Sequence, residues 1–246
     1  MRRSEYAKSI QRPAVWLSGI DQENHVTPRT RCIRIAFLSI LSISTVSTIA
    51  QQFTPIHSGV SATAGDTTLQ VTALRDDILR IRVCKGGAVP EDASWAVIPS
   101  SRTGSVGVIA EPQGFATKQL RVRLDEQFRL TVADFAGNVL QQDAAPVQWQ
   151  GTRFTVSKRR TSNDHYFGLG DKPGPLDRAG QAFTMWNTDS FGWRESADPI
   201  YKSIPFFLEV SHGRALGFFL DNTWRSVFTC TCKLQDCTCQ KSMRHS

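Results

Sequence analysis

Aromatic and acidic side chains gather in one stretch of this sequence. Trp186, Phe191, Trp193 and Tyr201 lie within sixteen residues, interspersed with Asn, Asp and Glu. Flat aromatic faces can stack on the C–H face of a sugar ring, while amides and carboxylates hydrogen-bond its hydroxyls. The mixture predicts a carbohydrate subsite. The structural alternative is a loop anchored by buried aromatic rings, with its acids in solvent.

Catalytic chemistry at this stretch would need a defined pair of acids. Glycoside hydrolysis usually takes two carboxylates, about 5–5.5 Å apart in a retaining enzyme. The acids available are Asp171, Asp177, Asp189, Glu195 and Asp198. Spacing along the chain assigns no geometry to any pair of them. The five histidines have no metal-ligand spacing, and Ser190 and Ser196 have no nucleophile-elbow context. We therefore predict no catalytic residue, no metal site and no cofactor.

Cysteines form a second cluster of reactive side chains. Cys230, Cys232, Cys237 and Cys239 make the pattern C-x-C-x4-C-x-C. Four thiolates in ten residues could hold zinc or form disulfides, although C-x-C crowds two ligands more than the usual C-x2-C. The composition changes abruptly after residue 228 to Cys, Thr, Lys and Gln. We expect an irregular tail over 229–246, with a metal site or a disulfide clip as alternatives.

The segments that must position these side chains have the pattern of β-strands. Residues 67–84 give two alternating runs around Arg75-Asp76-Asp77, which predicts a hairpin with Leu69, Val71 and Ala73 on its buried face. Further strands are predicted at 119–124, 127–140, 152–157, 204–210 and 214–220, the last two forming a hairpin of more buried strands. No window between 51 and 228 has a sustained 3.6-residue period. We predict an all-β fold, an antiparallel β-sandwich.

One segment, residues 166–203, breaks the rhythm of short strands. It is dense in Gly, Pro, Trp and Asp, and long organised loops are where binding groups concentrate. Its Gly168-Leu169-Gly170 lacks the third glycine and the strand-then-helix context of a dinucleotide fingerprint. We interpret these three residues as a tight turn.

The charge of the chain lies outside this predicted sandwich. Of a net charge of +7, residues 1–50 carry +4, residues 51–228 carry +1 and residues 229–246 carry +2. A nearly neutral body does not indicate a polyanion partner, so we expect no nucleic acid. We interpret the run Lys158-Arg159-Arg160 as a solvated strand end.

The leader, residues 1–50, has the pattern of a targeting signal. Residues 33–50 form an apolar stretch of signal-peptide length, preceded by Arg29, Arg31 and Arg34. Thr48 and Ala50 place small residues before a possible cleavage at Gln51. We expect a signal-like helix, a secreted or periplasmic protein, and no membrane attachment after cleavage. An N-terminal anchor or a buried helix is the alternative.

The later part of the chain resembles a known family. The strings YFGLGDKPGPLDRAG, FTMWNTDSFGW, DPIYKSIPFFLEV and ALGFFLDNTWRSVF are similar to the N-terminal domain of family 31 glycoside hydrolases, the α-glucosidase group. The resemblance covers roughly residues 54–228. It implies a galactose-mutarotase-like β-sandwich that precedes a catalytic (β/α)8 barrel.

The resemblance also assigns roles to particular residues. In that family the loop with the WN-x-D element reaches into the barrel, and its Asp contacts a substrate hydroxyl. Asp189 matches this Asp, so the resemblance implies that it binds an α-glucoside-type ligand, with Asn187 and Trp186 supporting the loop. The alternative for Asp189 is a carboxylate that caps its own loop.

The catalytic motifs of the family do not occur in this sequence. The family's nucleophile lies in a motif like W-x-D-M-N-E within the barrel, a fold of about 250 residues, and 18 residues follow Phe228. The leading hypothesis is an N-terminal, non-catalytic part of an α-glucosidase-like enzyme, inactive alone, with an exposed apolar face whose natural partner is the missing barrel. A stand-alone carbohydrate-binding sandwich and a Cys-rich metal-binding protein are the alternatives.

Overall fold

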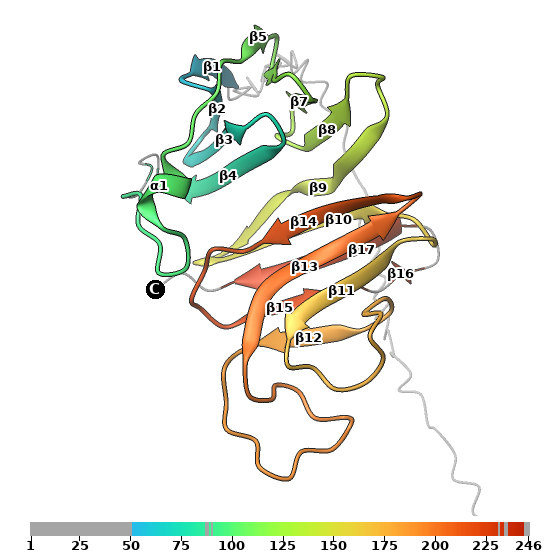
Figure 1. Cartoon of the computed structure of the whole chain (residues 1–246). Helices are drawn as coiled ribbons and strands as arrows, with labels where there is room; N and C mark the ends of the chain where they lie inside the picture. The colour runs from blue at the N-terminus through green and yellow to red at the C-terminus, as the bar shows by residue number, and fades with distance from the viewer. Residues whose placement is uncertain (1–50, 87–88, 90, 231, 234–235, 244–246) are drawn as a thin grey trace, which may run out of the picture. The chain divides into compact units, whose positions relative to one another are not determined.

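Nearly all of the regular secondary structure in the described part of the chain is β-structure. The computed structural model describes residues 51–246 except 87–88, 90, 231, 234–235 and 244–246, so the leader lies outside the described residues. Its strands are β1 Gln52–Ile56, β2 Gly59–Ala64, β3 Thr67–Arg75, β4 Ile78–Lys85, β5 Ile109–Glu111, β6 Gly114–Ala116, β7 Leu120–Leu124, β8 Leu130–Asp134, β9 Val139–Gln150, β10 Arg153–Arg160, β11 His165–Gly170, β12 Ala182–Met185, β13 Ser203–Ser211, β14 Arg214–Phe219, β15 Ser226–Thr229, β16 Cys232–Lys233 and β17 Asp236–Met243. One short helix, α1 (Pro99–Arg102), is present in this part of the chain (Figure 1).

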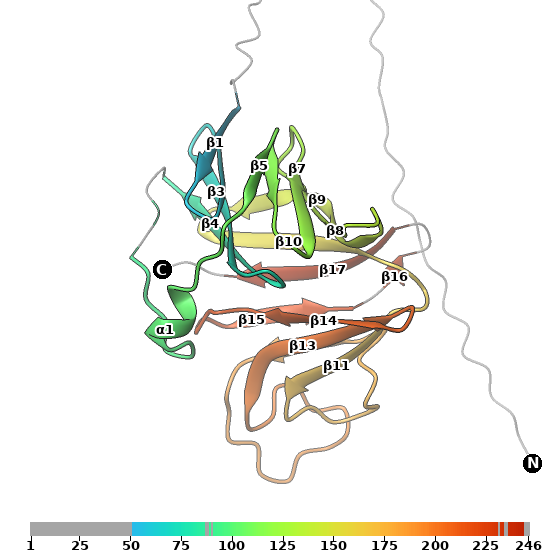
Figure 2. The same cartoon turned by 45° about the horizontal axis from the view of Figure 1, so that its top comes forward.

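The strands form three antiparallel sheets. The largest runs in the order β12-β15-β17-β10-β9-β8-β7-β6-β5, with β16 paired to β17. A four-stranded sheet, β1-β2-β3-β4, and a three-stranded sheet, β11-β13-β14, complete the fold. Figure 2 shows β13 and β14 lying beside β15 and β17 as a second layer. The predicted all-β antiparallel sandwich is confirmed.

The first hydrophobic core lies between the four-stranded sheet and strands β6 to β8. Val71 and Ala73 of β3 are fully buried and pack with Phe115, Val122 and Leu124. Period-two alternation places these residues on one face, as the sequence predicted. In the partner strand β4, Ile81 is exposed, because β4 is an edge strand and is covered less completely.

The second core joins the three-stranded sheet to the end of the largest sheet. Its centre is Phe207 of β13, whose ring stacks on Phe218 at 4.9 Å between centroids and meets Phe228 edge-on at 5.5 Å. Tyr166 of β11 and Cys230 close the same cluster. Aromatic rings from both layers therefore pack around the buried Phe207.

The hairpin β13–β14 is buried on one face and open on the other. Ile204, Phe206 and Leu208 alternate with Phe207, and between 38% and 45% of their surface is exposed, against 6% for Phe207. The hairpin was predicted correctly, but the expectation of two more buried strands was wrong for this outer face. The reason is that the described part of the chain supplies a layer on the Phe207 side only.

Gly168-Leu169-Gly170 is part of strand β11 rather than a tight turn. All three residues have positive φ, and the pairing of β11 with β13 shifts register between Gly168 and Gly170. A Cβ on Gly170 would lie 2.4 Å from the Lys202 carbonyl oxygen. The glycines thus permit a β-bulge at which two backbones approach closely.

The tail is not irregular where the structure describes it. Strand β17 pairs with β10 on one side and with β15 on the other, and β16 pairs with β17. The expectation failed because strand pairing uses backbone N–H and C=O groups, so two open strand edges can accept a segment of unusual composition. Cys230, which precedes β16 and β17, is buried.

Two charged side chains of β10 are partly buried and hydrogen-bonded within the fold. Lys158 donates to the buried Asp143 of β9, and Arg160 donates to the Cys230 carbonyl oxygen at 2.6 Å while lying over the Tyr166 ring. Of the run 158–160 only Arg159 is exposed. The solvated strand end expected there is therefore corrected, because each neighbour of Arg159 finds a partner inside the fold.

Two buried carboxyl groups, those of Asp164 and Glu209, interact electrostatically near this charged cluster. Asp164 accepts a hydrogen bond from the Thr161 hydroxyl at 2.6 Å, and Glu209 of β13 lies close to it. Burial, followed by the charge of Asp164, raises the pKa of Glu209 to about 7, from an ordinary value of 4.5. Glu209 therefore holds its proton in the folded state at mildly acidic pH.

Stability should fall as the pH rises through this range. Because the folded chain binds the Glu209 proton more tightly than the unfolded chain, the free energy of unfolding should drop between about pH 4.5 and pH 7, by on the order of 3 kcal/mol. Denaturant unfolding at pH 5 and pH 8 measures the drop, and Glu209→Gln should largely remove it. Equal pH dependence in both proteins would contradict this assignment.

Candidate functional site

A long loop projects from one end of the sandwich. It spans residues 188–201 and is closed at its base by a bridge in which the Thr188 N–H donates to the Tyr201 carbonyl oxygen at 3.0 Å (Figure 1). Strands β12 and β13 lead into and out of it. The WNTD string therefore stands where the chain leaves the sheet.

A buried cation fixes the base of this loop. The Lys172 side chain is fully buried, and its Nζ donates to the Thr184 carbonyl oxygen at 2.6 Å and to Asp198 Oδ1 at 3.1 Å. The other oxygen of Asp198 accepts the Thr184 N–H at 2.6 Å. The Arg178 guanidinium braces the segment that carries Lys172, because it donates to the carbonyl oxygens of Lys172 and Pro175.

Ser203 links the two sides of the loop base. Its hydroxyl exchanges hydrogen bonds with the Trp186 backbone, at 3.0 Å from the N–H and 3.1 Å to the carbonyl oxygen. Its own N–H donates to Asn187 Oδ1 at 2.8 Å. Asn187 is thus engaged in holding the loop base, while its amide nitrogen has no partner among the described residues.

The five candidate acids divide into structural and free groups. Asp198 pairs with Lys172, and Asp177 accepts from His165 Nδ1 at 2.7 Å and from two backbone N–H groups. Partial burial acts to raise the pKa of Asp177, but these hydrogen bonds outweigh it and hold the pKa below its usual value. Asp171 accepts a long bond from the Lys202 N–H. Asp189 and Glu195 are exposed, with carboxylates that accept no hydrogen bond within the described chain.

The aromatic side chains of the loop point outward. Their exposed fractions run from 41% for Tyr201 to 99% for Phe191, with Trp186 and Trp193 in between. The alternative of a loop anchored by buried aromatic rings is therefore wrong. The loop is anchored by the Lys172 ion pair and by Ser203, which leaves its rings available to a ligand or a partner.

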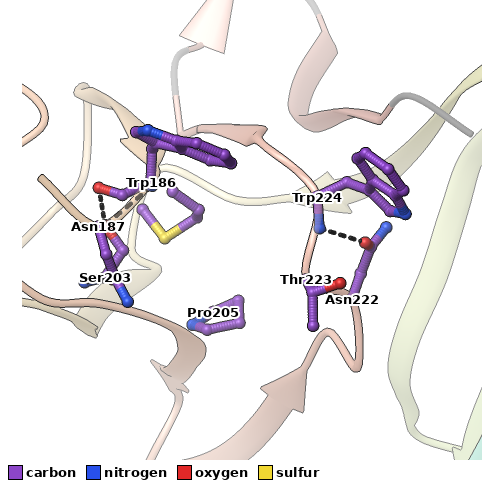
Figure 3. A pocket seen from close by; sticks show the side chains of 8 residues that line it. Trp186, Asn187, Ser203, Pro205, Asn222, Thr223 and Trp224 are labelled. Carbon is purple, nitrogen blue, oxygen red and sulfur yellow. Dashed lines mark hydrogen bonds between the residues drawn. The ribbon is translucent and has the colours of Figure 1, made fainter. Parts of the chain in front are cut away.

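A pocket of about 330 Å³ opens beside the loop base. Its lining residues are Met185, Trp186, Asn187, Ser203, Pro205, Asn222, Thr223 and Trp224. Figure 3 shows the indoles of Trp186 and Trp224 on opposite sides, with Pro205 lower in the view. The sequence singled out Trp186 and Asn187 but not the second wall, because 222–224 lie some 35 positions further along the chain.

Two features are absent from the part of the chain that the structure describes. No cluster of three or more His, Cys, Asp or Glu side chains there has the geometry of a metal site. No helix in that part of the chain has the length and apolar character needed to cross a membrane.

Comparison with known proteins identifies the architecture. Residues 68–228 match the model of the glycosyl hydrolase 31 N-terminal galactose mutarotase-like domain. The chain belongs to glycoside hydrolase family 31. The matched region includes the 188–201 loop and both walls of the pocket, so these features belong to the family's N-terminal domain.

Two α-glucosidases to which this chain is similar are much longer than it. It is 32% identical over 170 residues to α-glucosidase 2 of Bacillus thermoamyloliquefaciens, covering 65% of this chain and 21% of that protein. It is 35% identical over 79 residues to an α-glucosidase of Saccharolobus solfataricus, covering 32% of this chain and 11% of that relative. The chain thus spans about a fifth or less of either α-glucosidase.

Solved family 31 structures have the same fold in this region. A Flavobacterium johnsoniae dextranase, solved with glucose and in mutant form with isomaltotriose, matches with a TM-score of 0.68 and 28% identity over 79% of this chain and 24% of its own. A Listeria monocytogenes protein matches with a TM-score of 0.65 at 16% identity, over 79% of this chain and 19% of its own, which is a likeness of fold alone.

Two Asp-to-Ala substitutions should show which loop acid stabilises the fold and which does not. Asp198→Ala should lower the free energy of unfolding by on the order of 3 kcal/mol, because it leaves the Lys172 ammonium buried without its anion. Asp189→Ala, in the same loop, should change it by less than about 0.5 kcal/mol. Denaturant unfolding measures both. A comparable loss in Asp189→Ala would mean that Asp189 caps the loop instead.

Proposed function

We propose that this chain acts as the N-terminal domain of an exported α-glucosidase-type enzyme of family 31. In this role it supports a catalytic barrel and presents the 188–201 loop to a substrate held there. The chain itself is non-catalytic. The apolar stretch 33–50 and the arginines before it support export.

The observation that carries this proposal is the open apolar face of β13 and β14. Ile204, Phe206 and Leu208 project from β13, and Phe219 of β14 lies directly opposite Phe206 in the register. A contiguous apolar patch on one side of a sheet marks an interaction surface. The length of the α-glucosidase relatives beyond this domain supports a catalytic barrel as its occupant.

The loop supports the second half of the proposal. Asp189 is the acid in the WNTD string, it is exposed, and no hydrogen bond within the described chain engages its carboxylate. The anchored base at Lys172 and Ser203 would hold the loop rigidly away from the sandwich. A carboxylate so presented can accept hydrogen bonds from two sugar hydroxyls. The ligand class is an α-glucoside.

Complementation in trans tests the proposed role. The full chain would be combined with the Bacillus α-glucosidase lacking its own matching N-terminal domain, and hydrolysis of an aryl α-glucoside measured. We expect no hydrolysis by the chain alone and restored hydrolysis in the mixture. Asp189→Ala should lower kcat/KM at least about tenfold, since one charge-assisted hydrogen bond is worth about 1.5–3 kcal/mol.

Controls make the result decisive. Glu195→Ala removes an exposed acid from the same loop and should leave kcat/KM within about twofold. The relative's own N-terminal domain, supplied in trans, shows that the truncated enzyme can be rescued. If that domain restores hydrolysis and this chain does not, the proposal is wrong.

The open apolar face of β13 and β14 leads to a separate prediction about self-association. Phe206→Ser with Leu208→Ser should reduce self-association of the full chain, because both side chains project from the outer face of β13. Sedimentation velocity measures the association. Phe207→Ser, one position along the strand, should instead unfold the protein, because its ring is the centre of the second core. Equal association of the double variant and the parent would refute the interface.

A further inference from the structure

We propose that the pocket between Trp186 and Trp224 is a carbohydrate-binding site in its own right, which takes a single pyranose unit of a neutral glycan. It is built wholly from this chain, so it needs no other domain to be complete. Only the choice of α-glucans as probes rests on the proposed function. Nothing in the geometry of the pocket depends on a barrel.

The two walls of the pocket are aromatic and accessible. Trp224 is 46% exposed and Trp186 48%, and their indoles lie on opposite sides of the cavity (Figure 3). Large exposed indoles are unusual unless they meet a partner. A pyranose ring has C–H groups on its faces, so an exposed indole on each side of the cavity suits a flat, weakly apolar ring.

The polar groups of the pocket match the rim of such a ring. The Asn187 amide nitrogen and the Thr223 hydroxyl line the cavity and have no hydrogen-bond partner among the described residues. Both can donate to ring hydroxyls. No lining residue carries a formal charge, and the nearby Lys172 ammonium is already paired with Asp198. The site therefore favours an uncharged ligand over a phosphate or a uronic acid.

The pocket is also held in shape before any ligand arrives. Ser203 ties the backbone of Trp186 to the start of β13, and on the other wall the Trp224 N–H donates to Asn222 Oδ1 at 2.7 Å. Preorganised walls lower the entropy cost of binding. The backbone of each wall is thus held by hydrogen bonds within the fold.

Indole N–H signals provide a direct readout of this site. The full chain has six tryptophans, and each contributes one indole signal to the ¹⁵N–¹H spectrum. Trp186 and Trp224 can therefore be followed separately from Trp193 of the loop and from Trp95. Titration with isomaltotriose and with maltotriose should shift the signals of Trp186 and Trp224 saturably. Sorbitol, which has the hydroxyls but no ring face, should not shift them.

Matched variants localise the binding. Trp224→Ala should weaken binding at least about tenfold, because one stacking face is lost. An unchanged melting temperature of this variant would confirm that it is folded. Trp95→Ala removes a 96% exposed indole that does not line the pocket and should leave affinity unchanged. Trp224→Phe, which retains an aromatic face, should restore most of the affinity.

Four outcomes would overturn the site. They are the absence of saturable shifts with either trisaccharide, equal shifts with sorbitol, equal losses in Trp224→Ala and Trp95→Ala, and binding abolished by Asp189→Ala but not by Trp224→Ala. The last outcome would place the sugar on the loop. Failure of complementation in trans, with this binding intact, would reject the proposed function and leave the pocket standing.

Discussion

The buried ammonium of Lys172 is the constraint on which the functional end of this domain depends. It joins strand β12 through the Thr184 carbonyl, the far side of the 188–201 loop through Asp198, and the start of β13 through Ser203. A fully buried cation is tolerated only when its hydrogen bonds are satisfied, so these three segments cannot separate without leaving it unpaired. The aromatic rings of the loop and the pocket can consequently remain exposed, since they contribute little to holding the loop in place.

Two neighbouring surfaces meet at this anchored end. Strand β13 begins at Ser203 in the pocket, and its next outward residues, Ile204, Phe206 and Leu208, form the open apolar face. Pro205, between them, lines the pocket. One strand therefore contributes alternate residues to a polar-aromatic cavity and to an open apolar face, a direct use of the two-residue period of β-structure.

Sequence patterns predicted the parts of the fold that rest on local rules. Alternation at Leu69, Val71 and Ala73 fixed the buried face of β3, and the 204–220 hairpin was placed correctly. The same patterns failed wherever a distant segment decided the outcome. Lys158 and Arg160 looked solvated until Asp143 and the Cys230 carbonyl were brought to them, and the tail looked irregular until β10 and β15 offered it two strand edges.

The sequence by itself determined the fold class and the family, because these are written in short-range periodicity and in contiguous strings such as WNTD. Tertiary structure alone decided which of five acids are free, which face of β13 is open, and that Trp224 stands opposite Trp186. Those properties depend on hydrogen bonds and packing between residues tens of positions apart, and no local pattern encodes the distance between two side chains that only the folded sheets bring together.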